Sequence, residues 1–286
     1  MARAEPTKSG KMMFELSCHA KVNLSLEVLG RRPDGYHELR TLMHEIDLHD
    51  QIVVSLSPDG EDHLEVEGMD LGDAKQNLII LGLQALRVDG YHIPSLSMNL
   101  MKRIPIGGGL GGGSSDVVGL LVGLAQEFNI PGSVVDSVAA QLGSDTNFFI
   151  RGGSAWCYGR GEVIMPTEHT MNHFNLILPA WGCSTPKVFS HLQMPPLPDH
   201  CVAFEQGGAF DVGHNDLEEP CIQAYPEMGN LLFGLREKGF DAFLSGSGST
   251  LFTCHGDVSS RDREHAQLNP FCEGMRVIAS SSYFRP

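Results

Sequence analysis

The sequence predicts an α+β fold arranged in two lobes. Segments that alternate between apolar and polar residues gather in runs, which is typical of antiparallel strands. Helical patterns are interspersed among these runs and do not follow each strand in turn, so a regular parallel α/β sheet is not expected. The composition changes near His169, where prolines begin to interrupt the chain. The 286 residues are enough for two ordinary domains, which we place at residues 1–168 and 169–286.

The first lobe is expected to begin with strands. Residues 14–29 alternate between apolar and polar side chains, so Lys21 and Asn23 lie on the same polar face of a strand. By itself, one lysine in such a position is typical of a solvated face. Further strands are predicted over residues 41–48, 52–57 and 63–67, with Pro-Asp-Gly turns at residues 33–35 and 58–60.

The remaining elements follow from the period of the apolar residues and from cap and turn residues. Helices are predicted over residues 77–87, 114–128, 133–142 (with Ser133 as the N-cap), 226–239 and 262–268. Strands are predicted over residues 95–101, 147–150, 154–159, 241–244, 251–254 and 276–280, and residues 194–198 are predicted to be a connector.

The bulk composition excludes several classes of function. A net charge of −15 argues against general electrostatic binding to nucleic acid or to an anionic membrane surface. No apolar run reaches the roughly 18 to 20 residues of a membrane span, and no signal peptide is visible, so a cytoplasmic protein is expected. The seven cysteines are scattered without a CxxC motif and indicate reduced, packed side chains. His169 and His173 have helical spacing without a third ligand, which favours a surface pair over a metal site.

The most informative stretch is the glycine run that begins at Gly107 and leads into the predicted helix. It lacks the lysine of a Walker A motif. It contains a GxGxxG pattern, but any glycine-rich run satisfies that pattern, and the acidic residue about twenty positions later, Glu127, falls within the next helix. Protein-kinase HRD and DFG elements are absent from the sequence.

The physical chemistry of this run still favours a phosphate. Glycines let several backbone N–H groups converge, and Ser114 and Ser115 begin a helix whose unpaired N–H groups and dipole attract anions. The alternative is a tight turn with Ser114 as a plain N-cap, which does not require six glycines. We therefore predict a phosphate-binding loop.

Three other features remain open from the residues alone. A second glycine cluster, residues 244–252, is compatible with a hairpin turn or with close approach to a ligand. Asp145 follows a predicted helix end and fits either a turn former or a catalytic base. The same uncertainty applies to Lys21.

The order of the motifs resembles that of the GHMP small-molecule kinases. The four stretches are "AKVNLSLEVLGRRPDGYHEL" (residues 20–39), "PIGGGLGGGSSD" (105–116), "LGSDTNFF" (142–149) and "LSGSGSTLF" (244–252). The resemblance implies a two-lobed kinase fold, with an ATP-binding domain in residues 1–168 on a mixed or antiparallel sheet. Residues 169–286 are then a substrate domain, a ferredoxin-like α/β sandwich. Within the family, the first stretch is most similar to kinases that phosphorylate the 2-hydroxyl of a cytidine diphosphate derivative of methylerythritol, in non-mevalonate isoprenoid synthesis.

The resemblance also implies roles for individual residues. The catalytic group consists of Lys21, Asn23 and the base Asp145. Binding of the acceptor substrate is assigned to Tyr36, His37, Phe189, Gly246 and Gly248. Binding of ATP is assigned to Asn77, Lys102, Pro105, Gly107, Gly108, Gly109, Leu110, Gly111, Gly112, Gly113, Ser114 and Ser115.

The resemblance further implies ATP and Mg²⁺ as cofactors. Mg²⁺ would be held through ATP with help from Ser114 or Ser115, and the protein would be a monomer or a weak homodimer. One departure from the family pattern is Thr146-Asn147 after Asp145, where the family has valine and proline. The alternatives are a kinase for mevalonate, homoserine or a sugar, and a nucleotide-binding module without turnover.

Overall fold

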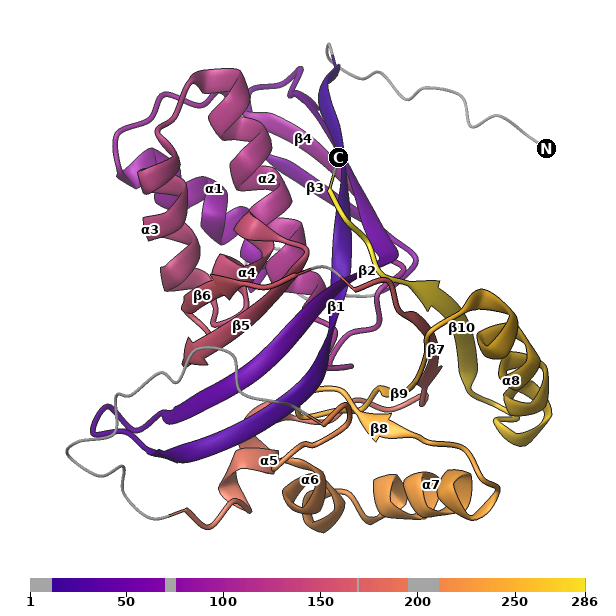
Figure 1. Cartoon of the computed structure of the whole chain (residues 1–286). Coiled ribbons are helices and arrows are strands. Elements are labelled where there is room, and N and C mark those ends of the chain that lie inside the picture. The colour runs from indigo at the N-terminus through magenta and orange to yellow at the C-terminus, as the bar shows by residue number, and fades with distance from the viewer. Residues whose placement is uncertain (1–11, 70–75, 169, 195–210, 286) are drawn as a thin grey trace, which may run out of the picture. The chain divides into compact units, whose positions relative to one another are not determined.

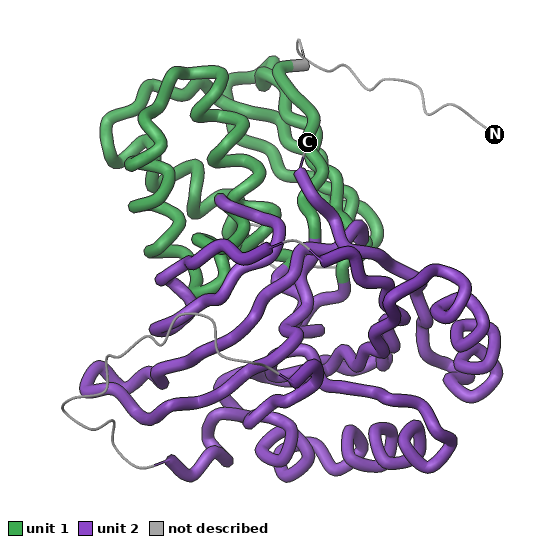
Figure 2. Tube along the Cα trace, viewed as in Figure 1, with its two compact units in different colours: residues 1–19, 49–104, 112–150 green, residues 20–48, 105–111, 151–286 purple. Residues whose placement is uncertain are grey.

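The computed structural model describes residues 12–69, 76–168, 170–194 and 211–285. Figure 2 shows that the chain divides into two compact units, which interleave along the sequence. Unit 1 comprises residues 1–19, 49–104 and 112–150, and unit 2 comprises residues 20–48, 105–111 and 151–286. Each compact unit combines segments that are distant in sequence, so the units do not test the predicted domain boundary between residues 168 and 169. That boundary stays a prediction.

Unit 1 combines strands with a group of helices. The long strands β1 (Met12–Arg31) and β2 (His37–Leu56) each contribute one end to this unit. Residues 51–56 of β2 pair antiparallel with β4 (Leu96–Met101), and β3 (His63–Glu67) pairs parallel with β4. The helices are α1 (Leu78–Val88), α2 (Gly112–Phe128), α3 (Gly132–Leu142) and α4 (Thr146–Arg151), and Figure 1 shows α1, α2 and α3 grouped together.

Two glycines in the middle of α2 explain how this helix packs so closely against β1. A Cβ at Gly119 would lie 2.5 Å from Sγ of Cys18, and a Cβ at Gly123 would lie 2.5 Å from the ring of Phe14. These glycines are four residues apart, so they lie on one face of α2, and that face packs against β1. A larger side chain at either position would push the helix away from the strand.

Unit 2 contains a second sheet with a ferredoxin-like topology. Its elements are β7 (His173–Leu178), α5 (Thr185–Ser190), α6 (Glu218–Ala224), α7 (Pro226–Glu237), β8 (Phe243–Leu244), β9 (Leu251–His255), α8 (Val258–Phe271) and β10 (Arg276–Ser281). The strand order is β10-β7-β9-β8 and every pairing is antiparallel. Two β-α-β units with this order form the split βαβ arrangement, so the ferredoxin-like expectation is confirmed. Unit 2 also contains β5 (Ser154–Gly159), which pairs with residues 39–44 of β2, and β6 (Val163–Pro166), which pairs with β5.

Several local predictions are wrong. Residues 147–150 form helix α4 and not a strand, because the short segment follows a helix end and begins with a buried threonine that bonds back to that end. The N-cap of α3 is Pro131 and not Ser133. The predicted strands 41–48 and 52–57 are one strand, β2. By contrast, the parallel pairing of β3 with β4 makes this sheet mixed, which agrees with the expected mixed or antiparallel sheet.

Three further observations concern the described ranges only. The six described cysteines are not disulfide-bonded, and none of the described residues forms a cluster of His, Cys, Asp or Glu able to hold a metal ion. In that part of the chain no helix has the length and apolarity needed to cross a bilayer. The connector predicted at residues 194–198 lies almost wholly outside the described residues, as does His169.

Candidate functional site

The polar face of β1 in unit 2 is buried and hydrogen-bonded. Lys21 and Asn23 are each 3% exposed, and Nζ of Lys21 donates to Oδ1 of Asn23 at 2.6 Å. Nδ2 of Asn23 donates to Oγ1 of Thr41 at 2.8 Å, and that hydroxyl donates to the carbonyl of Ser25 at 2.6 Å. Burying an ammonium group is costly unless partners compensate it, so this arrangement is not an ordinary solvated strand face.

The second glycine cluster meets this face. Oγ of Ser245 accepts a hydrogen bond from the backbone N–H of Asn23 at 3.2 Å. Gly246 has a φ of 58°, and a Cβ there would lie 3.1 Å from Oδ1 of Asn23 and 3.7 Å from Nζ of Lys21. Gly246 therefore brings bare backbone to the lysine, and two motifs more than 200 residues apart form one site. Gly248 packs instead against the side chains of Leu244, Cys183 and Cys221.

The first half of the glycine run also belongs to unit 2 and is held by backbone contacts. The N–H of Lys21 donates to the carbonyl of Leu110 at 3.0 Å, and the N–H of Thr250 donates to the carbonyl of Gly108 at 3.2 Å. Gly107, Gly109 and Gly111 have positive φ values of 65°, 72° and 71°. A Cβ at Gly109 would lie 2.4 Å from the carbonyl oxygen of Ser245, so glycine is required there for space as well as for conformation.

The hydrogen bonds of this run leave its backbone donors available. The carbonyl groups of Gly107, Gly108 and Leu110 accept hydrogen bonds from unit 2. Across the described residues, none of the N–H groups of residues 107–111 donates to another backbone carbonyl. A loop whose carbonyl groups are used and whose N–H groups remain as donors suits an anion such as a phosphate.

The second half of the glycine run begins helix α2 in unit 1. The helix begins at Gly112, so Gly112, Gly113 and Ser114 contribute first-turn N–H groups that have no partner within the helix. The side chain of Ser115 is buried, and Ser114 lies beside Gly143, where a Cβ would be 3.4 Å from the hydroxyl. Ser114 therefore lies close to the loop that carries Asp145.

Lys102 does not extend into solvent. Nζ of Lys102 bonds to Oδ2 of Asp50 and, at 2.7 Å, to Oδ2 of Asp116, and all three side chains are buried. Asp50 also accepts the backbone N–H groups of Arg103 and Ile104. Burial by itself lowers the pKa of Lys102, but the charges of Asp116 and Asp50 raise that pKa overall. Burial raises the pKa of Asp116 to about 7, against the opposing charge of Lys102.

This cluster locates the start of α2. It joins the end of β4, the segment before the glycine run and Asp116 near the start of the helix, and a Cβ at Gly112 would lie 3.2 Å from Nζ of Lys102. The sequence analysis missed Asp50 and Asp116. The signal for Asp116 was its position directly after Ser115, in the first turn of a predicted helix. No local pattern marks Asp50.

Asn77 and Asp145 occupy helix starts in unit 1. Asn77 is the N-cap of α1, with its side chain accepting the N–H of Ile79 at 2.9 Å. Asp145 directly precedes α4. The next residue, Thr146, is fully buried, and its hydroxyl lies 2.6 Å from the carbonyl of Ala139 and 2.7 Å from that of Gly143. The Thr146 hydroxyl therefore anchors this loop at the first of the two positions where the sequence departs from the family pattern.

The residues assigned to the cytosine of the substrate are distant in sequence from the glycine loops. Two of them, His37 and Phe189, form a close pair of rings. The rings of His37 and Phe189 have centroids 4.9 Å apart with an interplanar angle of 31°. Tyr36 is 53% exposed, and the guanidinium of Arg160 lies 4.8 Å from the centroid of its ring. Burial, and then the charge of Arg31, lower the pKa of His37. Arg160 is a candidate that the sequence analysis missed.

The predicted site residues thus form two groups. Unit 2 brings together Lys21, Asn23, Gly246 and residues 107–111, and separately His37 with Phe189. Unit 1 contains Asn77, Lys102, residues 112–115 and Asp145. The pairing of Lys21 with Asp145 stays a prediction.

Comparison with known proteins gives consistent matches. Residues 77–153 match the model for the GHMP kinases N terminal domain. The chain is 35% identical over 265 residues to the 4-diphosphocytidyl-2-C-methyl-D-erythritol kinase of Pelotomaculum thermopropionicum, which covers 87% of this chain and 91% of that protein. A crystal structure of 4-(cytidine 5'-diphospho)-2C-methyl-D-erythritol kinase matches with a TM-score of 0.75 and 29% identity, covering 95% of this chain and 100% of the other. The Methanococcus jannaschii mevalonate kinase matches with a TM-score of 0.64 at 14% identity, covering 98% of this chain and 100% of that chain, which shows a shared fold alone.

Proposed function

The chain belongs to the family of 4-diphosphocytidyl-2-C-methyl-D-erythritol kinases, within the GHMP kinases, and on that premise we propose its reaction and the roles of its residues. The protein is an ATP-dependent small-molecule kinase. The reaction is transfer of the γ-phosphoryl group of ATP to the 2-hydroxyl of 4-diphosphocytidyl-2-C-methyl-D-erythritol. The observation that supports this most directly is the buried Lys21–Asn23 pair against Gly246, because it places a cation beside bare backbone at one end of a phosphate loop.

The glycine run binds the phosphates of ATP in this proposal. Residues 107–111 supply N–H donors from a loop with positive-φ glycines, and residues 112–114 supply the first-turn donors of α2. Lys102 has a positioning role, because its ammonium is buried between Asp50 and Asp116 and fixes the start of the helix. Asn77, the N-cap at the start of α1, contributes to ATP binding through its backbone.

The residues at the start of α2 fit a magnesium ion. Ser114 and Ser115 offer hydroxyl oxygens, and Oδ1 of Asp116 has no hydrogen-bond partner among the described residues. Oxygen donors of this kind, together with phosphate oxygens and water, are what Mg²⁺ prefers. We therefore assign Ser114 or Ser115 to the ion, which when bound would neutralise charge on the phosphates.

Phosphoryl transfer requires positioning and charge compensation more than covalent chemistry. Asp145 accepts the proton of the substrate hydroxyl as that oxygen attacks. Lys21 is assigned to the same catalytic group and supplies positive charge for charge compensation. Asn23 orients Lys21 through its 2.6 Å hydrogen bond.

The cytosine end of the substrate is assigned to Tyr36, His37 and Phe189. The contact between the rings of His37 and Phe189 supports an aromatic platform for a base. Because the pKa of His37 is lowered, its ring is neutral at pH 7 and can both donate and accept a hydrogen bond. Arg160 holds the ring of Tyr36 from one side, which leaves the exposed ring oriented for stacking.

An ADP-release assay over a panel of alcohols tests this proposal. The panel contains 4-diphosphocytidyl-2-C-methyl-D-erythritol, mevalonate, homoserine and a sugar, each with ATP and Mg²⁺. We expect turnover with the cytidine compound and a large preference for it. Preference for another alcohol would assign a different GHMP activity, and tight ATP binding with no transfer to any alcohol would indicate a nucleotide-binding module. The cytoplasmic location and the monomeric or weakly dimeric state stay predictions.

A further inference from the structure

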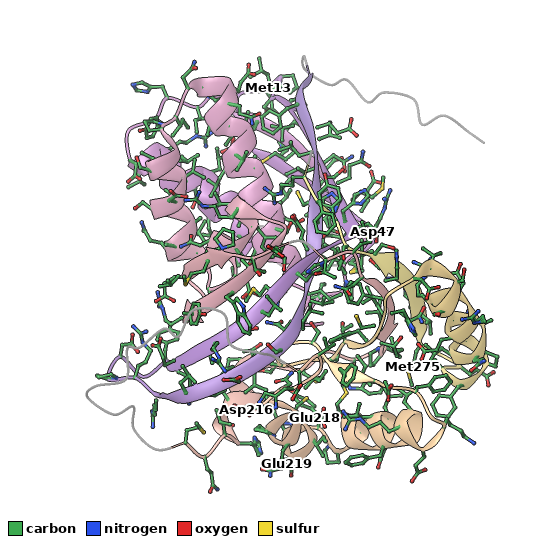
Figure 3. All side chains as sticks on the ribbon, viewed as in Figure 1. Met13, Asp47, Asp216, Glu218, Glu219 and Met275 are labelled. Carbon is green, nitrogen blue, oxygen red and sulfur yellow. The ribbon has the colours of Figure 1, made fainter. Side chains whose placement is uncertain are left out.

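A segment of unit 2 that the sequence analysis did not single out runs beside the lysine strand. Residues 213–216 make three backbone hydrogen bonds with β1. The N–H of Gly213 donates to Leu24 at 2.7 Å, the N–H of Leu26 donates to His214 at 2.8 Å, and the N–H of Asp216 donates to Leu26 at 3.0 Å. The carboxylate of Asp216, labelled in Figure 3, accepts the N–H of Val28 at 2.8 Å. The segment is therefore fixed to β1 directly after Lys21 and Asn23.

The side chain of Asn215 connects this segment to the second glycine cluster. Its Nδ2 donates to the carbonyl of Leu244 at 2.9 Å and to the carbonyl of Gly246 at 2.8 Å. Its Oδ1 accepts the N–H of Leu217 at 2.9 Å. Both protons of the amide and one acceptor site are used, so Asn215 has a defined orientation.

Gly246 also lies beside the Lys21–Asn23 pair. A Cβ at Gly246 would lie 3.1 Å from Oδ1 of Asn23 and 3.7 Å from Nζ of Lys21. Gly246 has a φ of 58°, a conformation that is not maintained by a side chain of its own. The carbonyl that Asn215 holds therefore belongs to a residue of the second glycine cluster that lies beside the Lys21–Asn23 pair.

We propose that Asn215 is a positioning residue that holds Gly246 against the Lys21–Asn23 pair, so that the phosphoryl acceptor end of the site keeps its geometry. The inference rests on the proposed function for its kinetic consequence. Its structural part, the restraint of residues 244–246 by the Asn215 amide, does not depend on any activity. Asn215 acts on the backbone of Gly246 and not on the substrate.

The test replaces the two donors without changing the shape of the side chain. Asn215→Asp keeps Oδ1 for Leu217 but presents an oxygen to the carbonyl groups of Leu244 and Gly246. We expect amide hydrogen exchange in residues 243–250 to become faster, and kcat to fall by about 10- to 100-fold, since two hydrogen bonds are lost and a repulsion is added. The KM for ATP should stay within about twofold, because the phosphate donors are elsewhere.

Three further variants make the outcome specific. Asn215→Ala removes the donors without adding charge and should show the same changes if the Asp variant does not fold. Asn99→Asp makes the same chemical change on β4, where the amide donates to exposed Glu67, and should leave kcat and exchange unchanged. Asp216→Asn keeps an acceptor for Val28 and should leave the exchange of residues 243–250 unchanged.

The results separate this inference from the proposed function. Unchanged exchange of residues 243–250 in both Asn215 variants would overturn the restraint, whatever the activity. Faster exchange with unchanged kcat would overturn the positioning role. If the wild-type protein phosphorylates none of the alcohols, the proposed function fails, and the exchange measurement still decides whether Asn215 restrains Gly246.

Discussion

Lys21 shows how much of a site depends on what covers a residue. Alternation along β1 predicts that Lys21 and Asn23 share a face, and the structure has them hydrogen-bonded on that face. Alternation does not predict that the face is buried, because Thr41 and Ser245 cover it from other segments of the chain. Burying an ammonium group costs free energy unless partners compensate it, and Lys21 is 3% exposed with its Nζ bonded to Asn23. The proposed catalytic role of Lys21 therefore depends on side chains that no local pattern identifies.

Asp145 is the residue for which a single substitution is most informative. We predict that Asp145→Asn binds ATP normally but lowers kcat by about 100- to 10,000-fold, because the amide cannot accept the hydroxyl proton. Isothermal titration with ATP and steady-state kinetics measure the two effects. Asp136→Asn, on the exposed side of α3, is the matched control and should behave like wild type. A near-normal kcat for Asp145→Asn would remove this residue from the mechanism.

His37 tests the assignment of the cytosine subsite. We predict that His37→Ala raises the KM of the cytidine substrate about tenfold and changes the KM of ATP less than twofold, since loss of a stacking and hydrogen-bonding ring costs roughly 1 to 3 kcal/mol. Because burial lowers the pKa of His37 below that of an ordinary histidine, its ring becomes protonated only at a lower pH, so the wild-type KM of the cytidine substrate should rise only on the acid side of the usual histidine range. His63→Ala, at an exposed histidine paired with Asp59, is the control. Equal effects on both KM values would contradict the assignment.

At the scale of elements, the long periodic segments were predictable and the short ones were not. The helices α1, α2 and α7 and the strands β4 and β5 lie close to their predicted positions, because each has a repeated apolar period or a clear cap. Residues 147–150 are too few to show a period, and the backward bond of Thr146 decides that they form a helix. The parallel pairing of β3 with β4 is also invisible locally, since it depends on the crossover through α1.

The Lys102 cluster holds an element junction, and its removal should destabilise unit 1. We predict that Lys102→Met lowers the free energy of unfolding by about 3 to 5 kcal/mol, because Asp50 and Asp116 would remain buried without a cation. Urea denaturation measures this change, and Lys238→Met, at an exposed position after α7, is the matched control. A loss below about 1 kcal/mol would mean that the carboxylates find other compensation and that the cluster does not hold the start of α2.

For the whole molecule, the two-lobed α+β class and the ferredoxin-like sheet could be anticipated, and the sheet order β10-β7-β9-β8 confirms the latter. The interleaving of the compact units could not be anticipated from the sequence. It arises because β1 and β2 are each 20 residues long, so one strand serves two units. Alternation locates a strand but does not show where along its length the packing partners change. Asp50 and Asn215 were missed for the same reason, because their partners are distant in sequence.

The net charge of the molecule leads to a prediction about salt. Both substrates are anionic and the chain carries a net charge of −15, so long-range electrostatics oppose their approach. Binding in the proposed site depends mainly on backbone N–H groups and one buried lysine, and not on a cluster of exposed cations. Raising sodium chloride from about 20 to 200 mM shortens the screening distance from roughly 20 to 7 Å, so we expect the KM of ATP to fall or stay level at saturating Mg²⁺. A KM that rises severalfold over this range would indicate an exposed cationic cleft and would contradict a phosphate site built from main-chain donors.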